Sequence, residues 1–193
     1  TSMSLLSQRQ QLIVAALLAL LMVMTRGHHF ADINVLHSAS WAVFMLAGFY
    51  LASKLWFPVF LGMAVGLDLM SVYIGGASNF CVSPAYGFLL PAYGSLWLAG
   101  RWFQSKYQFN WTALFTLALT LVSVTAIAGL FSGGGFYWFS GRYIDPTMAE
   151  YMTRFVQSYP GNLSKLSFYI AIAAVIHISF RFANLSQRSN QLR

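Results

Sequence analysis

Six long apolar stretches are the feature of this sequence that most restricts its fold. Each stretch has between 14 and 21 residues and at most one charged residue, and polar segments separate most of the stretches from the next. A helix that crosses the hydrocarbon core of a bilayer needs about 20 mainly apolar residues, so each stretch approaches or reaches the length of one span. The stretches are residues 12–25, 39–55, 57–74, 86–103, 111–131 and 166–182.

The composition excludes a soluble domain. Of the 193 residues, 58% are hydrophobic and only 8% are charged, whereas a soluble domain carries about 25% charged residues. We therefore predict an all-α, polytopic membrane protein in which residues 1–193 form one domain, a single bundle of about six transmembrane helices. Thr1 and Ser2, which precede Met3, resemble a cloning remnant.

Basic residues predict the orientation, because Lys and Arg are retained on the cytoplasmic side of a membrane. With a cytoplasmic amino terminus, the inner segments hold Arg9, Lys54, Arg101, Lys106, Arg181, Arg188 and Arg193, and the outer segments hold Arg26, Arg142, Arg154 and Lys165. Both termini are therefore predicted to be cytoplasmic, in a multi-pass protein of the bacterial inner membrane. The net charge of +7 is explained by inner segments that face an anionic leaflet, with no nucleic-acid partner.

Three segments of unusual composition are predicted to emerge on the outer face: residues 26–37, 75–83 and 132–165. The last is expected to be a long connection that begins with three consecutive glycines. Its aromatic residues are Phe136, Tyr137, Trp138, Phe139, Tyr143, Tyr151, Phe155 and Tyr159. Two interpretations stay open, an aromatic belt at the lipid headgroups and a lid over an apolar ligand with the glycines as its hinge.

Asp68 is the one acidic residue inside an apolar stretch. It lies six residues before the predicted outer end at Ile74, which places it about 9 Å below the outer surface. An ionisable group at that depth is a functional candidate. Its carboxylate is expected either to accept hydrogen bonds from ligand amides or to accept them from neighbouring helix hydroxyls or an Arg.

Cys81 and the pair His28 and His29 are the candidate metal ligands. The single cysteine lies among small and turn-forming residues, where it is either a small buried side chain or a soft thiolate ligand for a transition metal in a macrocycle. A neutral imidazole ligates metal or hydrogen-bonds an amide; His177, in the last stretch, is expected to be a packed core residue. No phosphate-binding loop is present, so ATP-driven transport requires a partner motor.

These residues resemble a known family. The length, six helices, cytoplasmic termini, outer loops and Ala15-x-x-x-Ala19 pair are similar to the substrate-binding S-components of energy-coupling factor (ECF) vitamin transporters. More specifically, residues 79–87 (NFCVSPAYG), together with His28, His29 and Asp68, resemble the BtuM-type vitamin B12 transporters.

The resemblance implies that the protein takes up cobalamin and binds it at the outer face. Cys81 would coordinate the cobalt as an axial ligand in the base-off form, and Tyr86, Asp68 and one of His28 and His29, with His29 favoured, would line the pocket. Ala15 and Ala19 would contact an ECF coupling subunit that carries the ATPases. Electron donation from the Cys81 thiolate would also promote cyanide loss from cyanocobalamin, the one catalytic activity considered for this chain.

Two alternatives stay open at this point. An S-component for riboflavin or thiamine would keep the fold but leave Cys81 without a role. A haem-binding electron carrier would use two of the four histidines as axial ligands, although three of them fall in one predicted loop. The four are His28, His29, His37 and His177.

Overall fold

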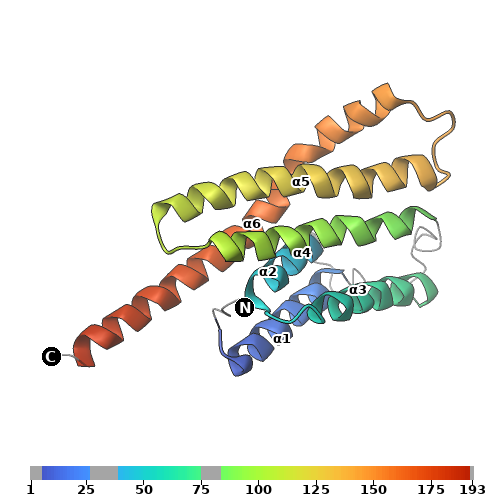
Figure 1. The fold of residues 1–193 in the computed structure, drawn as a ribbon. Coiled ribbons are helices and arrows are strands. Elements are labelled where there is room, and N and C mark those ends of the chain that lie inside the picture. Colours follow the sequence, from blue (N-terminus) through green and yellow to red (C-terminus); the bar gives the residue numbers. More distant parts are fainter. Residues whose placement is uncertain (1–5, 27–38, 75–83, 192–193) are drawn as a thin grey trace.

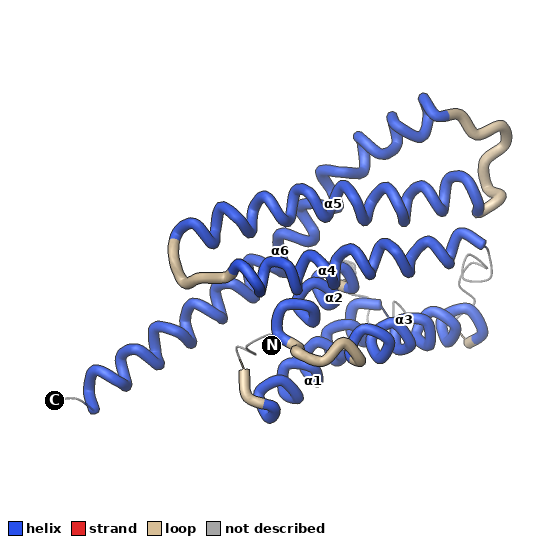
Figure 2. Tube along the Cα trace, in the orientation of Figure 1, coloured by secondary structure: helices blue, strands red, loops and turns tan. Residues whose placement is uncertain are grey.

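The structure is a computed structural model that describes residues 6–26, 39–74 and 84–191, and every regular element in these residues is a helix (Figures 1 and 2). The elements are α1 (Gln8–Arg26), α2 (Ser40–Tyr50), α3 (Trp56–Tyr73), the short 3-10 helix η2 (Pro84–Phe88), α4 (Leu89–Lys106), α5 (Trp111–Phe139) and α6 (Met148–Gln191). The predicted all-helical fold is therefore confirmed for the described residues.

Four of the helices, α1, α3, α5 and α6, are long and apolar enough to cross a membrane. The structure is thus compatible with a multi-pass membrane protein. Helix α4 has 18 residues but a more polar composition. Helix α2 has only 11 residues and a length of about 16 Å, roughly half the thickness of a hydrocarbon core, so it does not reach across by itself.

Successive helices alternate in direction, which gives the bundle two ends (Figure 1). At the Arg26 end, α1, α3 and α5 finish and α2, α4 and α6 begin; at the His177 end, α4 finishes and α5 begins. Helix α6 crosses the bundle obliquely and its carboxyl end projects beyond the other helices. Five helices supply the large side chains that are fully buried between them: Met22, Phe44, Phe60, Leu96 and Leu166.

Helices α2 and α4 pack with their backbones in contact, because each has a glycine at the crossing. A Cβ atom on Gly48 would lie 2.2 Å from the carbonyl oxygen of Trp97, and one on Gly100 would lie 2.0 Å from that of Met45. Small residues allow helices in membranes to approach this closely. The short helix α2 is thereby held against the middle of the bundle.

Helix α2 ends five residues earlier than the sequence predicted. Leu51 adopts an extended backbone, and the Arg101 guanidinium of α4 donates to the carbonyl oxygens of Leu51 and Ala52 at 3.2–3.3 Å. The Gln11 side chain of α1 accepts from the Ala52 N–H at 3.0 Å. Non-helical backbone between packed helices needs such partners, and here two neighbouring helices provide them.

The prediction of a long connection over residues 132–165 was wrong. Helix α5 continues to Phe139 and α6 begins at Met148, so only residues 140–147 connect them. A Cβ atom on Gly135 would lie 2.4 Å from Phe88 Cβ, and one on Gly134 would lie 3.0 Å from the Tyr151 hydroxyl. These glycines therefore allow η2 and α6 to pack closely on α5. They lie inside a helix and are not the hinge of a loop, as the lid interpretation had expected.

Candidate functional site

A polar network joins four helices and η2 at the Arg26 end; it consists of Arg26, Ser40, Asp68, Tyr86 and Tyr93. Arg26 Nε donates to Asp68 Oδ1 at 2.6 Å, and Nη2 is ion-paired with Asp68 Oδ2. Arg26 Nη1 donates to Ser40 Oγ and to the Tyr93 hydroxyl, each at 2.7 Å. The Tyr86 hydroxyl donates to Asp68 Oδ2 at 2.6 Å.

The network is largely buried, so it helps to hold together the helices that it joins. The side chains of Arg26 and Asp68 are only 12% and 16% exposed, and the two charges neutralise each other through a bidentate contact. Tyr93 also stacks on the buried ring of Phe44, with ring centroids 4.4 Å apart. Removing one member of a buried ion pair leaves the other charge uncompensated, at a cost of about 3–5 kcal/mol.

Asp68 and Tyr86, which the resemblance assigned to one pocket, lie in direct contact. Of the two roles left open for Asp68, the structure shows the carboxylate bonded within the protein, to an Arg and a Tyr hydroxyl. Sequence reasoning missed the contribution of Arg26 and Tyr93. A signal was present, because a lone acid in an apolar helix requires a cation nearby, and Arg26 ends α1 at the same end of the bundle.

The other predicted ligand-binding residues, Cys81, His28 and His29, lie outside the described residues. These residues lie in two segments, 27–38 and 75–83, and the structure describes the residues that flank each segment. Residues 27–38 leave from Arg26 and return at Ala39, whose N–H donates to the Thr25 hydroxyl at 3.2 Å. Residues 75–83 run from the end of α3 to η2, which carries Tyr86. Both segments are therefore attached to the bundle beside the polar network.

The small-residue pair on α1 faces the interior of this chain. Ala15 is 4% exposed and belongs to the hydrophobic core, and Ala19 is partly buried against that core. The open face of α1 instead carries larger side chains: Leu12, Ile13, Leu17, Leu20, Val23 and Met24.

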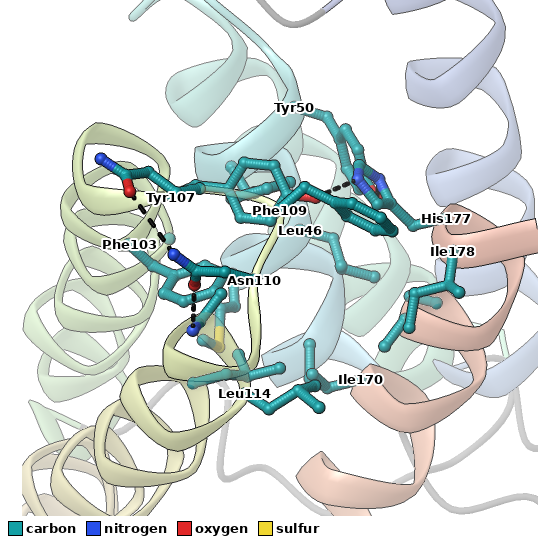
Figure 3. A pocket seen from close by; sticks show the side chains of 18 of the residues that line it. Leu46, Tyr50, Phe103, Tyr107, Phe109, Asn110, Leu114, Ile170, His177 and Ile178 are labelled. Carbon is teal, nitrogen blue, oxygen red and sulfur yellow. Dashed lines mark hydrogen bonds between the residues drawn. The ribbon is translucent and has the colours of Figure 1, made fainter. Parts of the chain in front are cut away.

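A second feature, a cavity at the His177 end, was not predicted. It has a volume of about 490 Å³ and lies between α2, α4, α5 and α6. His177 was expected to be a packed core residue, but it is half-buried and lines this cavity. Its Nδ1 is 2.8 Å from the Tyr50 hydroxyl and its Nε2 is 2.8 Å from the Tyr107 hydroxyl (Figure 3).

The described residues contain no group of three or more His, Cys, Asp or Glu side chains placed to hold a metal ion. No protein-family model matches the chain, and a search of the curated proteins finds no match.

Proposed function

We propose that this protein takes up cobalamin across the bacterial inner membrane and binds it at the Arg26 end. In this proposal the Cys81 thiolate is the axial cobalt ligand, and cobalamin is bound base-off. One observation carries most weight: the segments that hold Cys81, His28 and His29 are attached to the bundle beside one polar network. Residues far apart in sequence would thereby become available to a single ligand.

The chemistry of the residues suits this ligand. Cobalamin has a large corrin ring with mostly apolar faces and an amide fringe, and it needs at most one axial ligand from the protein. A thiolate is a soft ligand suited to that position, and His28 or His29 would hydrogen-bond the fringe.

Asp68 retains capacity for such a ligand. A carboxylate has about four acceptor positions, and contacts with described residues use three of those of Asp68, one on Oδ1 and two on Oδ2. One amide N–H of the corrin fringe would donate to Oδ1 without displacing Arg26. Tyr86 would line the same part of the site through its contact with Asp68.

Thiolate ligation also supports cyanide loss from cyanocobalamin. Electron donation from sulfur to cobalt weakens the bond on the opposite axial position. The cobalt–carbon bond breaks, cyanide leaves with the bonding electron pair, and cobalt stays in the +3 state. Under reducing conditions that keep Cys81 as a thiol or thiolate, we expect a slow spectral change after cyanocobalamin binds, and its absence would contradict this step.

Transport driven by ATP hydrolysis would need a motor outside this chain, because the sequence has no phosphate-binding loop. An ECF-type coupling subunit with its ATPases is the partner that the resemblance implies, with Ala15 and Ala19 as the contact. Since Ala15 is buried in this arrangement, docking at that pair would require α1 to shift relative to α2 and α3.

Competition binding tests the ligand assignment. Purified protein in detergent would be titrated with cobalamin, riboflavin, thiamine and haem, each followed by its own absorption or fluorescence. We expect saturable binding of cobalamin alone. Binding of riboflavin or thiamine in its place would support the other-vitamin alternative. Haem absorption after expression with haem supplied would support the electron carrier, although both ring nitrogens of His177 are already bonded to tyrosines.

A further inference from the structure

The cavity at the His177 end is separate from the proposed cobalamin site and has the dimensions of a lipid chain. Its volume of about 490 Å³ is within the range of small-molecule pockets, about 300–1,000 Å³. On α6 its lining extends from Ile170 to Phe182, a distance of about 18 Å along the helix. One leaflet of the hydrocarbon core is about 15 Å thick, so a single acyl chain matches this length.

The cavity has apolar walls and a few polar groups at one end. Figure 3 shows Tyr50, Tyr107 and His177 at one end and the apolar side chains of Leu114 and Ile170 at the other. A chain that entered between these walls would remove apolar surface of Leu114, Ile170 and their neighbours from contact with water or headgroups.

The three polar side chains leave one hydrogen-bond donor for a ligand. A neutral imidazole has one N–H and one acceptor nitrogen, so one tyrosine hydroxyl donates to His177 and the other accepts from it. The tyrosine that accepts retains its own O–H for a further acceptor. The ester and phosphate oxygens of a phospholipid are acceptors of this kind.

The charge of this end favours an anionic ligand. Its described basic residues are Arg9, Lys54, Arg101, Lys106, Arg181 and Arg188, whereas the described acidic residues, Asp68, Asp145 and Glu150, lie toward the Arg26 end. Arg181 lies one turn after His177, with its guanidinium carbon 5.3 Å from the centroid of the Phe109 ring. Burial raises the pKa of Tyr107, and the positive charge of Arg181 acts in the opposite direction.

We propose that this cavity binds one acyl chain of an anionic phospholipid, whose phosphate is held by Arg181 and a tyrosine hydroxyl beside His177. The lipid would fill the space between α2, α4, α5 and α6. This proposal stands independently of the cobalamin assignment, since none of its residues belongs to the polar network at the Arg26 end.

Native mass spectrometry of the full chain tests the proposal. The protein would be released from micelles containing equal amounts of phosphatidylglycerol and phosphatidylcholine with identical acyl chains. We expect one retained phosphatidylglycerol per wild-type chain. Arg181→Gln should reduce the preference for phosphatidylglycerol about fivefold, the factor expected for one basic residue near an anionic surface. Arg188→Gln, seven residues further along the same helix, should leave it unchanged.

Filling the cavity gives a second test. Ala174→Trp places a large side chain in the cavity and should abolish retention, whereas Ala183→Trp, on an exposed position of α6 outside the lining, should not. Equal retention of both lipids by the wild type would overturn the proposal, as would unchanged retention by Ala174→Trp. If inorganic phosphate alone raised the unfolding temperature as much as phosphatidylglycerol does, the site would bind phosphate and the lipid assignment would be wrong.

Discussion

Replacing Gly100 with Ala should destabilise the protein, because no space exists for a side chain between α2 and α4. The added Cβ atom would lie 2.0 Å from Met45 O and 3.0 Å from Phe49 N. Since an ordinary contact begins at 3.4 Å, the two helices would have to separate by about 1.4 Å at this point. Both contacted atoms belong to the backbone, so no side-chain rotation relieves the clash.

The expected magnitude is a net loss of about 2 kcal/mol. Overpacking of a core typically costs about 1–3 kcal/mol, and a backbone clash belongs at the upper limit of that range. Alanine recovers about 1 kcal/mol through its higher helix propensity. For a chain of this size, about 2 kcal/mol corresponds to a fall in the unfolding temperature of roughly 4–8 °C.

The assay is thermal unfolding of the purified protein in detergent, followed by tryptophan fluorescence. The matched control is Gly62→Ala in α3, where a Cβ atom would meet nothing within 4 Å. The control should unfold at the wild-type temperature or slightly above it. Equal unfolding temperatures for Gly100→Ala and Gly62→Ala would refute the close backbone contact between α2 and α4.

Two further predictions concern the Arg26 end. Arg26→Met or Asp68→Leu alone should lower the free energy of unfolding by about 3–5 kcal/mol, because each leaves one buried charge unpaired, and the double variant should recover much of that loss. A double-mutant cycle from thermal or denaturant unfolding checks this, and additive effects would contradict a direct ion pair. Gly135→Ala should lower the unfolding temperature and weaken cobalamin binding, because the added Cβ would lie 2.4 Å from Phe88 Cβ and displace η2 together with Tyr86. The matched control is Gly133→Ala, whose Cβ would meet nothing within 4 Å, and it should change neither property. Identical behaviour of the two glycine variants would argue against the packing of η2 on α5.

The helical type of the described elements was predictable, because apolar runs of this length have few alternatives in a membrane. The residues at which the helices end were less predictable. Residues 133–135 suggested a loop because glycine is a poor helix former, yet close packing against Phe88 and Tyr151 requires small residues inside α5. Helix α2 stops early because Arg101, about 50 residues away in sequence, satisfies the backbone after it.

The candidate site was partly predictable. The resemblance assigned Asp68 and Tyr86 to the lining of one pocket, and the two residues share a hydrogen bond. The partner of Asp68, Arg26, lies 42 residues away in the sequence, so the sequence indicated only that a lone acid in an apolar helix needs a nearby cation, and not which cation that is. The cavity beside His177 has no sequence signature either, because its walls come from four helices and its size depends on how they cross.

The measurement that tests the central claim most directly is the absorption spectrum of the purified protein after incubation with cobalamin, for the wild type and for Cys81→Ala. We predict a shifted corrin spectrum for the wild type that is absent from the variant, which would establish both the ligand and the sulfur–cobalt bond. A wild type that binds no corrin would contradict cobalamin uptake, and a variant with the same shifted spectrum would contradict ligation by Cys81.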